Sequence, residues 1–143
     1  MLFNDDWGTN RGYIWRNAME CFQQFPVMKK AIGFGPDTFG IVLLNKTAGN
    51  RYGQTFDNAH NEYLHYLITV GFAGLTAYLV FLFSFAVRVI RRAGENQYIA
   101  AAFFAVLCYS AQAFVNLNLP IATPIMWMLF MLGELGIRES RSF

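Results

Sequence analysis

Two histidines near the middle of the chain are the residues best suited to chemistry. His60 and His65 stand in the segment FDNAHNEYLHYL, where several polar side chains meet the start of a long apolar stretch. Five residues along a helix correspond to a rotation of about 140°, so the two imidazoles do not converge on one metal ion. The metalloprotease pattern needs histidines four apart with a glutamate after the first, and this segment lacks it. The spacing therefore argues against a zinc site and leaves acid–base chemistry as the candidate role.

His60 is the better placed of the two histidines for proton transfer. We expect Asp57 or Asn58 to cap a helix and His60 to lie in its first turn, at the outer face of a membrane. The positive end of the helix and the apolar surroundings would both disfavour the imidazolium form. A neutral imidazole is a competent general base at neutral pH. An interfacial polar anchor is the alternative role for His60, and the residues alone leave it open.

Stretches without charged residues predict the helices that position these histidines. No Asp, Glu, Lys or Arg occurs between His65 and Arg88, or between Glu95 and Glu134. A helix needs about 20 apolar residues to cross a bilayer, so the first stretch predicts one transmembrane helix at about 64–88. The second stretch suits two, at about 97–116 and 121–137, because the Asn and Pro residues of NLNLPIATP disfavour a continuous helix. The prediction is an all-α, polytopic membrane protein with three transmembrane helices.

Composition narrows the class of protein further. Hydrophobic residues make up 55% and charged residues 14% of the 143 residues, which excludes a disordered chain. A net charge of +2 argues against a nucleic-acid partner, and two cysteines cannot form a disulfide scaffold. The alternative to a membrane protein is a soluble bundle with buried helices, but residues 66–87 lack the polar stripe of a soluble helix.

Basic residues predict the orientation in the membrane. They gather in the segment RVIRRAGENQ and in the tail RESRSF, and basic flanks stay on the cytoplasmic side. Three spans then place residues 1–63 outside as an extracytoplasmic loop region, 64–143 in the transmembrane region, and the C-terminus in the cytoplasm. The first residues carry no signal peptide, because they have neither a basic start nor an apolar run.

The polar half should contain short amphipathic helices. Apolar residues recur at helical spacing in RGYIWRNAMECFQQFP (11–26), and Pro26 should end that helix. Such a helix suits either a membrane interface or packing inside a soluble cap. IGFGPDTFG (32–40) predicts a turn, with Pro36 opening a short helix, and residues 43–56 read as a loop.

Several strings together resemble one protein family. RGYIWRNAMECFQQFP is followed by IGFGPDTFG, by AHNEYLHYLITVGFAGLTAYL and by YSAQAFVNLNLPIATPIMWMLFMLGE. In this order they resemble the C-terminal region of the O-antigen ligase and O-antigen polymerase superfamily, and the resemblance covers nearly the whole chain. It implies a cell-membrane enzyme of envelope polysaccharide assembly. Members transfer a glycan from an undecaprenyl-diphosphate carrier to an acceptor hydroxyl on a lipid or another glycan, without a metal or other cofactor.

The resemblance also assigns roles to residues. The essential arginine of the family's Arg-x-x-x-Trp helix corresponds to Arg11, and the histidine of its His-Asn motif to His60. Arginine pairs bidentately with phosphate oxygens, so Arg11 suits the departing diphosphate, with Arg16 or Arg51 in support and Asn61 as a further substrate-binding residue. His60 then suits the role of base for the acceptor hydroxyl.

The chain is shorter than the members of the family that it resembles. Family members have many more spans before this region, so we expect a C-terminal fragment. Its expected partners are the missing N-terminal membrane half, the polyprenyl-diphosphate-linked glycan, the acceptor and membrane lipid. The competing hypothesis is a non-catalytic membrane subunit or inactive remnant that packs against partner helices. A small transporter is less well supported, because the three spans show no inverted repeat.

Overall fold

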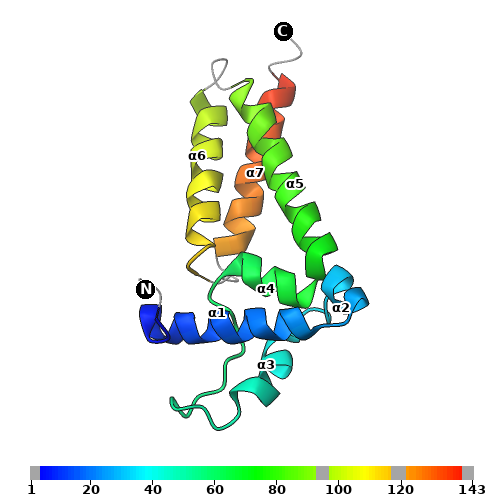
Figure 1. Ribbon diagram of the computed structural model, residues 1–143. Helices are drawn as coiled ribbons and strands as arrows, with labels where there is room; N and C mark the ends of the chain where they lie inside the picture. Colours follow the sequence, from blue (N-terminus) through cyan, green and yellow to red (C-terminus); the bar gives the residue numbers. More distant parts are fainter. Residues whose placement is uncertain (1–3, 93–96, 117–121, 140–143) are drawn as a thin grey trace. The chain divides into compact units, whose positions relative to one another are not determined.

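The computed structural model describes residues 4–92, 97–116 and 122–139, and in this part of the chain the only regular elements are helices, without strands. The all-α prediction is therefore confirmed for the described residues. Seven helices follow one another along the chain (Figure 1): α1 Trp7–Gln24, α2 Val27–Ile32, α3 Phe39–Thr47, α4 Glu62–Thr69, α5 Gly71–Ile90, α6 Gln97–Gln112 and α7 Ala122–Glu139.

The chain divides into two compact units. The first comprises the described residues up to Thr76 together with Val115 and Asn116, and the second comprises the rest. In the first unit α1 contacts both α3 and α4, and α2 contacts α4. The core of this unit joins three helices and the segment before α4, through Ile14, Ala18, Phe22, Phe39, Leu43, Phe56, Ala59, Leu64 and Ile68.

Helix α1 confirms the helix expected over 11–26. Gly8, Thr9 and Asn10 have positive φ angles, so the regular part of the helix begins at Arg11. The helix ends before Pro26, whose ring cannot continue a helix. Four of its apolar residues, Ile14, Ala18, Cys21 and Phe22, are buried, and the helix contacts α3 and α4. Of the two interpretations of this helix, the structure shows the packing helix.

The single helix expected over 64–88 is divided into α4 and α5. The break lies at Val70 and Gly71, and Gly71 has a φ of +67°. A Cβ atom at Gly71 would lie 2.5 Å from the carbonyl oxygen of Ala31, and one at Gly33 would lie 2.2 Å from that of Thr69. We call this close approach of two backbone turns, at Gly33 and Gly71, the glycine corner. Only residues without a Cβ fit here, and the apolar pattern gave no sign of it.

Helix α3 differs from its prediction at both ends. Pro36 does not open it, because Asp37 follows with a φ of +58° that a helix cannot contain. The helix begins at Phe39 instead, after Thr38, and continues to Thr47, well into the segment that we expected to be a loop.

The second unit is formed by α6, α7 and most of α5. Helices α6 and α7 pack along each other, and the rings of Phe85 and Phe130 lie 4.5 Å apart in the core. Arg88 donates a hydrogen bond to Glu134 (Nε to Oε1, 2.8 Å). The break expected between the last two spans falls mostly at residues 117–121, which lie outside the described residues.

One helix in the described part of the chain, α5, is long and apolar enough to cross a membrane, and α6 is apolar but shorter. Only 11% of the apolar window of α5 is buried, so α5 is unlike the core helix of a soluble protein. Apolar side chains are also exposed on α6 and α7, among them Phe104, Leu107, Met128, Met131 and Leu132.

Candidate functional site

A hydrogen bond connects α1 to the segment that carries His60. The indole Nε1 of Trp15 donates to the carbonyl oxygen of Ala59 over 2.7 Å. The rings of Tyr13 and Phe56 lie 5.7 Å apart and add a second contact between the same two segments. Ala59 is fully buried. The backbone next to His60 is therefore held against α1.

His60 lies before α4 and not in its first turn, so the expected position was wrong. Its φ of +48° is outside the helical range, and its backbone N–H donates to Oδ1 of Asn58 over 2.9 Å. Asn61 is the residue that caps α4, through its side-chain oxygen, which accepts a hydrogen bond from the N–H of Leu64 at 3.0 Å. Asn58 is thus engaged in a turn that holds His60 ahead of the helix.

The electrostatic surroundings of His60 favour its neutral form. Partial burial of the imidazole lowers the pKa of His60 below its ordinary value of 6.5, the positive charge of Arg11 lowers it further, and Asp57 opposes the shift. Burial is one of the two causes expected from the sequence, and the charge of Arg11 is a cause that was not expected. The two residues expected to be catalytic therefore lie close enough to interact.

Helical geometry explains why Arg11 lies near His60. Arg11 and Trp15 are four residues apart and so share one side of α1. Because Trp15 is hydrogen-bonded to Ala59, the side of α1 that carries Arg11 faces the segment around His60. A cation in the neighbourhood of an imidazole with a lowered pKa is suited to binding an anionic group near a proton acceptor.

Arg16 and Arg51 are engaged elsewhere, each with a carboxylate. Arg16 makes a bidentate pair with Asp5 (Nε to Oδ1, 3.0 Å; Nη2 to Oδ2, 2.6 Å). Arg51 contacts Oδ1 of Asp6 over 2.6 Å. Both arginine side chains are more than half exposed. No local pattern indicated these partners, because Arg51 and Asp6 are far apart along the chain.

His65 is part of the packing of the first unit. Its ring stacks on Phe39, with 5.2 Å between centroids and 18° between planes. Its Nδ1 atom is buried and has no hydrogen-bond partner within the described ranges. A stacked and largely enclosed imidazole has little access to a substrate.

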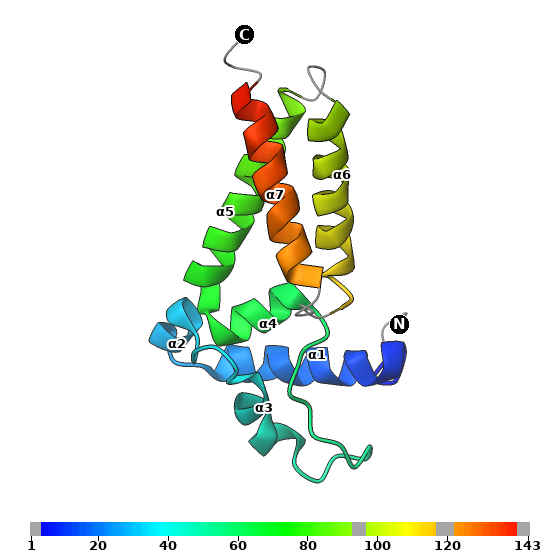
Figure 2. The same ribbon diagram turned by 180° about the vertical axis from the view of Figure 1, so that it is seen from behind.

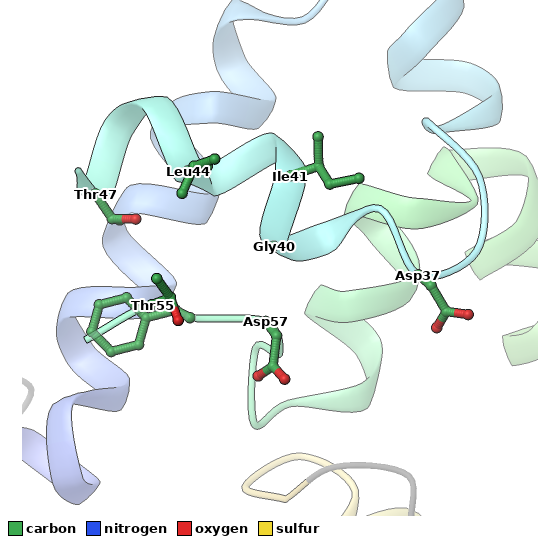
Figure 3. A pocket seen from close by; sticks show the side chains of 8 residues that line it. Asp37, Gly40, Ile41, Leu44, Thr47, Thr55 and Asp57 are labelled. Carbon is green, nitrogen blue, oxygen red and sulfur yellow. The ribbon is translucent and has the colours of Figure 1, made fainter.

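A groove of about 310 Å³ runs along α3 and the segment before His60. Figure 3 shows Asp37 and Asp57 toward one end of it and Leu44 and Thr47 toward the other. Asp57 also acts on the pKa of His60, so one of the residues that line the groove lies near His60. Sequence reasoning considered Asp57 only as a helix cap. Its position three residues before His60 was the one available signal.

Comparison with known proteins identifies the family. A family model described as O-antigen ligase matches residues 3–79. No curated protein and no solved structure matches the chain. The matched range includes α1, with Arg11 and Trp15, and the segment that carries His60. Because the match covers more than half of the 143 residues, the chain belongs to the O-antigen ligase family.

Proposed function

We propose that this chain carries the extracytoplasmic catalytic residues of a membrane enzyme that moves a glycan from a polyprenyl diphosphate to an acceptor hydroxyl. The observation that carries the proposal is that Arg11 is near enough for its positive charge to lower the pKa of His60, on the side of α1 that Trp15 holds against Ala59. A cation and a neutral base side by side meet the two electrostatic needs of this transfer. Family membership supports a lipid-linked glycan as the general class of substrate.

The reaction assigns one task to each residue. Nε2 or Nδ1 of His60 accepts the proton of the acceptor hydroxyl while the oxygen forms a bond to the anomeric carbon of the donor glycan. The bond between that carbon and the diphosphate oxygen breaks, and the diphosphate leaves with the bonding electrons. Arg11 binds the phosphate oxygens with its two-pronged guanidinium group and stabilises the negative charge that develops there.

The supporting residues take roles that fit their contacts. Asn61 acts through the cap of α4, which fixes the backbone next to His60. Arg16 and Arg51 would bind the carrier at the edge of the site. A phosphate of the carrier would there replace Asp5 or Asp6 as the partner of an exposed guanidinium. We place the acceptor glycan in the groove at Asp37 and Asp57, because carboxylates accept hydrogen bonds from sugar hydroxyls.

We further propose a multi-pass topology, with spans formed by α5, α6 and α7, residues 1–63 outside and the C-terminus in the cytoplasm. The apolar residues exposed along these helices support it, because soluble monomers rarely expose large apolar patches. Labelling with an impermeant thiol reagent tests the orientation. A cysteine at Gly49 should react in intact cells and one at Gly94 should not. The opposite pattern would refute the topology.

A glycan-transfer assay with purified lipid-linked donor tests the catalytic assignment. In membranes that contain the full gene product, His60→Ala should lower transfer by about 10²–10⁴-fold, whereas His65→Ala should retain most of the activity at matched membrane levels. Binding of the carrier lipid should survive in both variants. Near-normal transfer by His60→Ala would contradict the proposal and favour a family member that only packs against partner helices.

A further inference from the structure

The short helix α2 exposes apolar side chains that a water-facing surface does not explain. Val27 is 82% exposed, Met28 67% and Ile32 57%, and none of the residues of α2 is buried. Phe34, just after the helix, and Phe72, in the first turn of α5, are exposed as well. We call Val27, Met28, Ile32, Phe34 and Phe72 the α2 patch.

A row of aromatic rings connects the α2 patch to the beginning of α5. Phe34 lies 4.7 Å from Phe25, Phe25 lies 5.6 Å from Phe22, and Phe22 lies 5.3 Å from Phe72, measured between ring centroids. Figures 1 and 2 show α2 beside the N-terminal end of α5 in both views. Packed aromatic rings, among them the buried Phe22, thus connect the segment at α2 to the first turn of the helix proposed to enter the membrane.

The glycine corner fixes this arrangement. The N–H of Gly35 donates to the carbonyl oxygen of Thr69 over 2.8 Å, and the backbones at Gly33 and Gly71 are in direct contact. The turn after α2 therefore cannot move away from the turn between α4 and α5 without breaking these contacts. Helix α2 is therefore held beside the N-terminal end of α5.

Two lysines give the α2 patch a charged border. Lys29 and Lys30 lie in the last turn of α2, and Nζ of Lys29 is 4.8 Å from the centroid of the Phe34 ring. Lysine side chains at such a border place their methylene groups against apolar surface and their ammonium groups at the level of lipid phosphates. A partner with an apolar interior and anionic groups at its surface matches this pattern.

We propose that α2 lies in the interface of the outer leaflet, with the α2 patch in the acyl-chain boundary and Lys29 and Lys30 at the lipid phosphates. The inference rests on the proposed membrane placement of α5. It assigns interfacial binding to α2, whereas the sequence pattern left α1 open between a membrane interface and packing, and α1 is already packed in the core. Anchoring here holds the first unit against the bilayer, where a polyprenyl diphosphate presents its headgroup.

Depth-dependent quenching tests this placement in the full chain. A Cys108→Ala background removes the exposed cysteine, while Cys21 is buried. An environment-sensitive fluorophore is attached to Met28→Cys, and in a separate variant to Val27→Cys, in nanodiscs of phosphatidylcholine and phosphatidylglycerol that contain nitroxide-labelled lipids. Both labels should be quenched by lipid nitroxides at a depth of about 5–10 Å below the phosphates. A label at Gln54→Cys, on an exposed loop, should stay in water and unquenched.

A label at Val80→Cys, on the exposed side of α5, separates the two ways in which the inference can fail. If the Val80 label is quenched and the labels on α2 are as water-exposed as the Gln54 label, the interfacial placement of α2 is wrong while the membrane placement stands. If the Val80 label is also unquenched, the membrane placement itself is wrong. Labels on α2 that are shielded from water but not quenched by lipid nitroxides would show that protein covers the patch, and would also overturn the inference.

Discussion

The indole nitrogen of Trp15 is hydrogen-bonded over 2.7 Å to the carbonyl oxygen of Ala59, the residue directly before His60. This relationship gives the Arg-x-x-x-Trp pattern a physical meaning. Trp15 holds the segment that carries the imidazole, and Arg11, one turn earlier on the same side of α1, supplies the charge that acts on it. The hydrogen bond holds the two motifs together although 44 residues separate Trp15 from Ala59.

Replacing Trp15 by Phe should loosen the catalytic pair. The variant keeps an aromatic ring but removes the donor, and the loss of one such hydrogen bond costs about 1 kcal/mol. We expect the free energy of unfolding in detergent to fall by about that amount. We expect transfer activity to fall by a larger factor than this loss of stability alone would explain. Met19→Leu, on the exposed side of α1, is the matched control. Equal activity in both variants would show that the hydrogen bond does not position His60.

Arg11→Lys should lose activity even though the positive charge remains. Lysine offers a point charge and cannot form the two parallel hydrogen bonds that guanidinium makes with phosphate. Loss of one charged hydrogen bond, at about 1.5–3 kcal/mol, predicts roughly a tenfold or greater decrease in kcat. Lys46→Arg, at a residue paired with Glu20, should not change kcat. If Arg11→Lys transfers at the normal rate, Arg11 acts through its charge alone.

The pH profile of transfer should report on His60. The base must be neutral, so activity should rise with pH through the pKa of His60 and reach a plateau. Burial and Arg11 hold this pKa below 6.5, so the midpoint of the rise should lie below pH 6.5. Arg11→Gln removes one cause of the shift and should move the rise toward higher pH, whereas Arg11→Lys keeps the charge and should leave it in place. A rise at the same pH in both variants would refute the coupling.

Asp57→Asn should affect acceptor use more than donor use. The variant removes a carboxylate from one end of the groove and also removes a charge that opposes the lowering of the His60 pKa. We expect a several-fold increase in KM for the acceptor, as for the loss of one hydrogen bond of about 1 kcal/mol, and a shift of the pH rise to lower pH. Steady-state kinetics with each substrate varied in turn measure both effects. An unchanged acceptor KM would place the acceptor outside the groove.

Alanine at either residue of the glycine corner should destabilise the first unit strongly. Gly33 and Gly71 have positive φ angles, and a Cβ at each would meet backbone atoms. Gly49→Ala is the matched control, because Gly49 has a φ of +69° but open space around it. The control should cost about 1–2 kcal/mol for the left-handed conformation alone, and the corner variants more. Thermal unfolding in detergent compares them, and equal losses would mean that the close approach is not required.

The sequence predicted the features that depend on local pattern. Pro26 correctly ended α1, and the charge-free stretches correctly indicated helices. The break at Gly71 was missed because apolar residues continue on both sides of it, and the reason for the break is contact with Ala31, which no local pattern contains. The same holds for Arg16 and Arg51, whose carboxylate partners belong to the N-terminal segment. The position of His60 was missed because three polar residues before α4 could each have served as its cap.

The ion pair between Arg88 and Glu134 bears on how the chain is inserted during biosynthesis. Both residues lie toward the C-terminal ends of their helices, where an ionised side chain costs less than the about 2.5–3.5 kcal/mol of the centre of a span but still favours a partner. In the proposed topology α5 is synthesised first and carries Arg88, so the counter-charge for Glu134 is already in the bilayer when α7 leaves the translocon. Retention of the last helix then depends on an earlier one, and the two are assembled as a unit and not as independent anchors.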